Sequence, residues 1–127
     1  DLLTWMHQNK ADYTNTFCIL MNENIKEAKI YKDENFLGWK EQWQERLKIH
    51  NNSPEKFLKL MRSANPLVIP RNHKVEEALE AANNDDLNPM KNLLKVLEKP
   101  YENQEGISEY QSPAPASDQK YQTFCGT

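Results

Sequence analysis

Apolar residues recur three or four positions apart along most of this chain, and this spacing limits its fold more than any other feature. It places apolar side chains on one face of an α-helix, whereas a strand would require alternation at every second residue. With a further helix near Leu2, Leu3 and Met6, the sequence predicts an all-α fold, a bundle of five or six short helices. The stripes that predict it are Tyr13, Phe17, Leu20 and Met21; Phe36, Trp39, Trp43 and Leu47; Phe57, Leu60, Met61 and Ala64; Val75, Ala78, Leu79 and Ala82; and Met90, Leu93, Leu94 and Leu97.

Residues that cap or interrupt helices stand where these stripes begin and end. Asp12 and Asp33 are expected N-caps, because a short polar side chain can accept a hydrogen bond from a free N–H of the first turn. Ser53-Pro54 and Asn88-Pro89 each place such a side chain before a proline at the first helical position. The prolines within residues 65–70 predict an extended connection between two helices.

The periodicity stops after Pro100. Residues 102–127 include the run Ser-Pro-Ala-Pro-Ala-Ser at 112–117, a composition typical of extended, weakly ordered chain. This segment also holds four acidic residues against one lysine, so it accounts for the net charge of -3. We therefore expect a helical region at residues 1–101 and a flexible acidic tail at residues 102–127.

Charge, apolar run length and glycine content exclude several classes of function. The basic residues are balanced by acids and form no clustered face for a phosphate backbone, so no nucleic-acid partner is expected. No apolar run approaches the roughly 20 residues of a membrane-spanning helix, so no membrane partner is expected either. The three glycines, Gly38, Gly106 and Gly126, are isolated, which excludes a Walker A loop and a G-x-G-x-x-G turn.

The two cysteines stand far apart, at Cys18 and Cys125. They form no C-x-x-C motif and no disulfide scaffold, and no secretion signal is present, so a reducing, cytoplasmic location is expected. Cys18 follows Phe17 in the middle of an expected amphipathic helix and is expected to be a small, buried, inert thiol. Cys125 lies third from the chain end, where an exposed thiol can exchange with a disulfide or be oxidised.

The histidines and acids do not predict a catalytic or metal centre. The histidines are far apart in sequence and lack ligand spacing, so structural or solvent-exposed roles are expected for His7, His50 and His73. Three acids flank one apolar stripe and are expected to form a solvated helix surface: Glu76, Glu77 and Glu80.

The aromatic residues Phe36, Trp39 and Trp43 allow two interpretations. At helical spacing they are expected mainly in the core, packed against other helices. They could also line a groove that binds a partner peptide or helix, which would make the chain an autonomous helical interaction module. A third interpretation is a redox protein that acts through Cys125.

Several motifs resemble the C-terminal region of the selenoprotein O family. Residues 65–72, NPLVIPRN, match N-P-x-x-x-x-R-N, and residues 93–101, LLKVLEKPY, match L-L-x-V-L-x-x-P-Y. Upstream, residues 11–17, ADYTNTF, resemble A-D-[YF]-T-x-T-F, and residues 43–47, WQERL, resemble W-x-x-R-L. The family's terminal cysteine or selenocysteine corresponds to Cys125.

This resemblance implies a protein adenylyltransferase with a protein-kinase-like fold, which transfers AMP from ATP to hydroxyl groups of protein substrates using Mg²⁺ or Mn²⁺. The family's nucleotide and metal residues belong to a longer N-terminal part, so no catalytic, cofactor or metal residue is expected here. The chain also opens on Asp1 inside an expected helix, without an initiator Met. We therefore expect a piece of a longer protein, inactive alone, whose partner is the missing kinase-like part.

The resemblance also assigns expectations to single residues. It implies that Cys125 pairs with a cysteine of the kinase-like part and makes activity redox-sensitive. Asp12 and Trp43 fall in matched motifs, as structural or interdomain contacts. Two interpretations stay open for Arg71 and Asn72: Asn72 caps the next helix while Arg71 anchors the connection before it, or Arg71 contacts the kinase-like part or its substrate.

Overall fold

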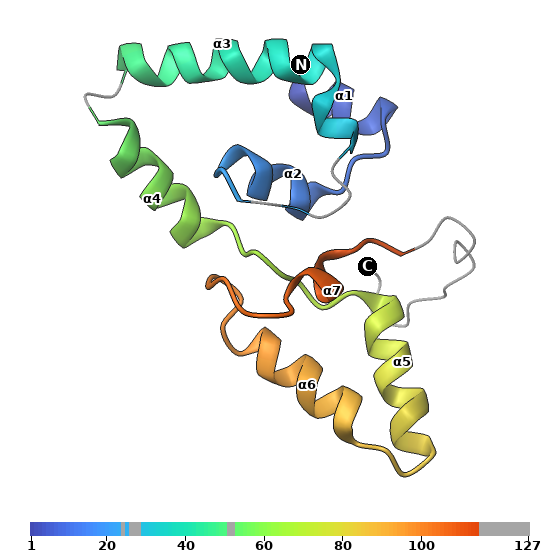
Figure 1. Cartoon of the computed structure of the whole chain (residues 1–127). Helices are drawn as coiled ribbons and strands as arrows, with labels where there is room; N and C mark the ends of the chain where they lie inside the picture. Colours follow the sequence, from blue (N-terminus) through green and yellow to red (C-terminus); the bar gives the residue numbers. More distant parts are fainter. Residues whose placement is uncertain (24, 26–28, 51–52, 115–127) are drawn as a thin grey trace. The chain divides into compact units, whose positions relative to one another are not determined.

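The computed structural model describes residues 1–23, 25, 29–50 and 53–114, and within these every regular element is a helix (Figure 1). The all-α prediction is confirmed. The elements are α1 (Leu2–Gln8), α2 (Tyr13–Leu20), the 3₁₀ helix η1 (Lys29–Lys32), α3 (Glu34–His50), α4 (Pro54–Ala64), α5 (Asn72–Asn83), α6 (Asn88–Leu97) and α7 (Ser108–Gln111). The described part thus holds seven α-helices rather than five or six, because α7 lies within the expected tail.

The chain divides into two compact units, Asp1–Leu67 and Val68–Thr127. The first unit contains α1 to α4 with η1, and the second contains α5 to α7. The expected extended connection is confirmed: residues 65–71 are non-helical between α4 and α5.

The core of the first unit is aromatic. Trp5 from α1 lies against Phe36 from α3, with ring centroids 4.8 Å apart, and Tyr31 from η1 contacts the same Phe36 ring at 5.3 Å. Phe36 is almost fully buried, so the prediction of a core role is confirmed for this residue. The partly buried Trp39 and Trp43 pack against this cluster. Rings of this size bury a large apolar area, which stabilises a unit made of short helices.

Of the four caps predicted at Asp12, Asp33, Ser53 and Asn88, the first three are confirmed. The Asp12 carboxylate accepts from the Asn15 backbone N–H at 2.9 Å, and the Ser53 hydroxyl accepts from the Lys56 N–H at 3.4 Å. The Asp33 Oδ2 accepts from the Phe36 N–H at 3.3 Å and also from the Trp5 indole Nε1–H at 2.8 Å. One carboxylate therefore both begins α3 and fixes α1 against it.

The predicted cap at Asn88 is wrong. The helix begins one residue earlier than expected, so Asn88 is its first helical residue and Leu87 takes the N-cap position without a side-chain bond. The Asp86 carboxylate accepts from the Asn88 N–H at 3.1 Å instead. Asp85 has a φ of 66° in the turn between α5 and α6, a conformation that aspartate tolerates better than most residues.

Part of the expected tail packs onto the helices of the second unit. Gly106, with a φ of 77°, turns the chain into α7, and the side chains of Ile107 and Gln111 are buried. The Gln104 amide donates to the carbonyls of Val96 and Lys99, both at 2.9 Å, and so satisfies acceptors at the end of α6. Side-chain contacts thus hold residues 104–111 against the helices, although this segment has no helical apolar periodicity.

Candidate functional site

The first unit contains a cavity of 310 Å³ between the end of α2, the second half of α3, and α4. Trp43 and Leu47 stand one helical turn apart on α3 and form an apolar wall, and Leu58 of α4 belongs to the same lining. The lining residues are Leu20, Asn22, Trp43, Gln44, Leu47, Lys48 and Leu58. The cavity is therefore mostly apolar, with two amides and one ammonium group.

Trp43 is held in place by neighbouring rings. Its ring stacks on Trp39 with centroids 6.0 Å apart and an interplanar angle of 11°, and it meets the Phe57 ring edge-on at 6.3 Å. Of the three aromatic residues considered for a groove, Trp43 lines the cavity, whereas Phe36 belongs to the core. The sequence could not locate Leu20 and Leu58 in this wall, because they come from other helices.

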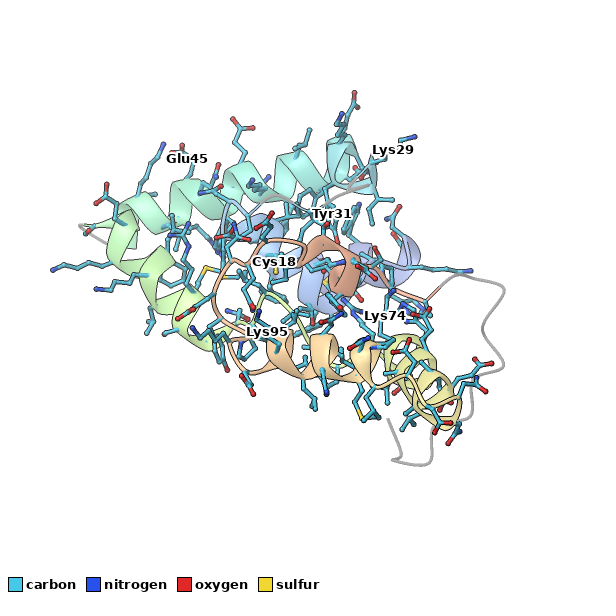
Figure 2. The ribbon with its side chains drawn as sticks, turned by 60° about the horizontal axis from the view of Figure 1, so that its bottom comes forward. Cys18, Lys29, Tyr31, Glu45, Lys74 and Lys95 are labelled. Atoms are coloured by element: carbon cyan, nitrogen blue, oxygen red, sulfur yellow. The ribbon has the colours of Figure 1, made fainter. Side chains whose placement is uncertain are left out.

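Arg62 connects two of the cavity walls. Its guanidinium donates to the backbone carbonyl of Met21 at 3.3 Å and lies 3.6 Å from the Glu23 carboxylate. These contacts tie α4, which carries Leu58, to the end of α2, which carries Leu20. Lys48 of the lining pairs with Glu45 at 3.3 Å, and both side chains are exposed; Figure 2 shows Glu45 on α3.

The chemistry of this cavity suits binding. Its lining contains no histidine, cysteine, aspartate or glutamate, the residue types that most often act as general bases or metal ligands. In the described part of the chain no three His, Cys, Asp or Glu side chains gather closely enough to hold a metal ion. What the walls offer is an apolar contact with a fixed indole and a polar rim.

In the second unit, Arg71 and Lys74 hold α7 at the start of α5. The Arg71 Nη2 donates to the Gln111 backbone carbonyl at 3.1 Å, and the Lys74 ammonium lies 3.3 Å from Glu77 and 3.6 Å from Glu109. This bond joins Arg71, the residue before α5, to the last residue of α7. The expected cap at Asn72 is wrong, because Asn72 is the first helical residue and Arg71 occupies the N-cap position without a side-chain cap bond.

The remaining candidate residues lie elsewhere, apart from Glu77, which pairs with Lys74. Cys18 is fully buried, as predicted, with its Sγ 3.6 Å from the Pro66 carbonyl oxygen (Figure 2). His7 is exposed on α1, and His73 is buried on α5. Cys125 lies outside the described residues. The acids Glu76, Glu77 and Glu80 are exposed, as expected for a solvated helix surface.

Among the described residues, no helix combines the length and the apolar character needed to cross a membrane.

Comparison with known proteins finds one family model and a consistent set of relatives. The family described as "Protein adenylyltransferase SelO" matches residues 1–98. A protein nucleotidyltransferase YdiU from Pelagibacter ubique is 54% identical over 127 residues, which is 100% of this chain and 26% of the relative. Proteins of the same name from Alcanivorax borkumensis and Bacillus mycoides are 45% and 46% identical over 100% and 99% of this chain. The chain thus spans about a quarter of the length of the curated relatives it matches.

Proposed function

The chain belongs to the SelO family of protein adenylyltransferases, and on this premise we propose that it is the C-terminal helical region of a longer enzyme of that family. The observation that carries the proposal is the match to Pelagibacter ubique YdiU along the whole chain, which covers only 26% of that protein. The longer enzyme transfers AMP from ATP to hydroxyl groups of protein substrates in the cytoplasm, with Mg²⁺ or Mn²⁺. Its nucleotide and metal sites lie in a kinase-like part outside this chain.

In this proposal the region supports catalysis without taking part in the chemistry. In the second unit, Arg71 and Lys74 are engaged in holding α7. The lining of the cavity in the first unit contains no histidine, cysteine, aspartate or glutamate. The helical units therefore act as a scaffold that packs on the kinase-like part.

The first experiment is intact-mass spectrometry of a generic acceptor protein incubated with ATP and Mg²⁺ or Mn²⁺. This chain is compared with the full-length product of the gene that encodes it. An addition of the mass of AMP by the full-length product alone is the expected result. Addition by this chain alone would contradict the scaffold role, and no addition by either would contradict the adenylyltransferase activity.

We also propose that Cys125 regulates the enzyme by forming a disulfide with a cysteine of the kinase-like part. The support from the structure is indirect: Cys18 is fully buried, so its thiol is shielded from exchange, and Cys125 is the other cysteine of the chain. In the full-length enzyme, Cys125→Ser should abolish the difference in activity between oxidising and reducing conditions. Cys18→Ala is the matched control and should leave that difference unchanged.

A second candidate function is an autonomous interaction module, and the 310 Å³ cavity beside Trp43 favours it. An apolar side chain of a partner peptide would fill this cavity. If this function holds, the isolated chain is monomeric, melts cooperatively and binds a partner. Leu47→Asp, a change in the cavity wall, should then abolish this binding. The control is Glu41→Gln, an exposed change on the same helix.

A further inference from the structure

Helix α6 carries apolar side chains over a wider arc than it buries. At about 100° per residue, Leu97 lies about 40°, Met90 about 60° and Leu94 about 100° from Leu93 around the helix. Exposure rises in the same order: Leu93 is 6% exposed, Met90 and Leu97 are half-buried, and Leu94 is 54% exposed. Leu87, about 120° from Leu93, is also exposed. One flank of the helix therefore remains apolar and uncovered.

Helix α5 shows the same gradient with the same sense of rotation. Ala78 is 2% exposed, and the half-buried Ala82 and Val75 lie about 40° and 60° from it by the same helical geometry. Leu79 follows at about 100° and is 45% exposed. Ala82, Val75 and Leu79 thus lie at the same angles from Ala78 as Leu97, Met90 and Leu94 lie from Leu93.

These two flanks lie on one side of the helix pair. A short turn joins α5 to α6, and the two helices contact each other and diverge from this turn in a V, with opposite chain directions (Figure 1). In an antiparallel pair, the same sense of rotation away from the contact line leads to the same side on both helices. Lys74, which binds Glu109 of α7, lies about 40° to the other side of Ala78. We call the shared side the open face; it comprises Val75, Leu79, Ala82, Leu87, Met90, Leu94 and Leu97.

Single exposed leucines are ordinary on protein surfaces, but a continuous apolar face marks a contact with another surface. We propose that the open face packs against an apolar surface of the remaining part of the longer polypeptide. This inference rests on the proposed function, because about three quarters of the length of Pelagibacter ubique YdiU lies outside the matched region. A covalently linked surface also meets the open face at a high effective concentration, which a separate copy of the chain would not.

The test compares the isolated chain with a full-length chimera, in which this chain replaces the aligned quarter of Pelagibacter ubique YdiU. Leu94→Glu places a carboxylate on the open face, and Asn92→Glu makes the same change in charge at an exposed position elsewhere on α6. We expect both variants to leave the melting temperature of the isolated chain nearly unchanged. In the chimera, Leu94→Glu should lower it by about 5 °C or more, because a buried contact is lost, while Asn92→Glu should not.

Equal melting of the two chimeric variants would overturn the proposal, and Leu79→Glu, on the other helix of the face, provides a second test of the same kind. A dimer of the isolated chain that Leu94→Glu dissociates, with no effect in the chimera, would assign the face to a second copy and would also overturn it. Failure of the proposed function looks different: the unsubstituted chimera would then transfer no AMP, whatever the melting of its variants.

Discussion

Substituting Asp33 by alanine removes two contacts of the first unit at once. The Phe36 N–H at the start of α3 loses its cap, which costs about 1 kcal/mol. The Trp5 indole N–H, on a buried ring, loses an acceptor at 2.8 Å, which costs about 1 to 2 kcal/mol more. We therefore expect Asp33→Ala to lower the free energy of unfolding of this unit by about 2 to 3 kcal/mol.

Urea unfolding followed by tryptophan fluorescence measures this loss selectively, because all three tryptophans of the chain lie in the first unit. With an m value of about 1 kcal/mol/M for a unit of this size, the midpoint should fall by about 2 to 3 M. Asp33→Asn retains an acceptor oxygen and should recover most of the loss. Ser53→Ala, which removes only a cap, should cost about 0.5 to 1 kcal/mol. A midpoint shift for Asp33→Ala no larger than that for Ser53→Ala would refute the reasoning.

Three further predictions concern Phe36, Arg71 and Cys18. Phe36→Ala should destabilise the first unit by about 3 to 5 kcal/mol, measured by the same titration, and a loss below about 1 kcal/mol would contradict its place in the core. Arg71→Ala should speed proteolysis near α7, while Arg62→Ala should not; equal rates at that site would show that Arg71 does not hold α7. The Cys18 thiol should react with an alkylating reagent only as the first unit unfolds, as mass spectrometry of the labelled chain would show, and rapid labelling of the native chain would disprove its burial.

The sequence predicted the helices well because their signal is local. Apolar spacing located α2 to α6, and short polar side chains marked the starts of α2 and α3 at Asp12 and Asp33. The starts of α5 and α6 were misplaced by one residue, since asparagine suits both an N-cap and a first-turn position. The Asn88 N–H donates to the side chain of Asp86, and the apolar pattern gives no information about this contact.

The missed features depend on contacts between distant residues. Helix α7 has four residues and no apolar period, and it is held by Arg71, which lies 40 residues before Gln111. The cavity beside Trp43 needs Leu20 and Leu58 from two other helices, so no single stripe predicts it. The open face is an intermediate case: Leu79 and Leu94 belong to the predicted stripes, but the sequence does not show which part of a stripe is covered.

The stack of Trp39 on Trp43 gives the cavity an optical signal of its own. Two indoles with centroids 6.0 Å apart and nearly parallel rings share their electronic excitation, so their near-ultraviolet circular dichroism depends on the geometry of the pair. Trp43 is also a wall of the cavity, so a molecule that contacts its indole and shifts it will change that geometry. Occupancy of the cavity can thus be followed in solution by circular dichroism without a label. Trp39→Phe would remove the signal of the indole pair while leaving Trp43 in the cavity wall.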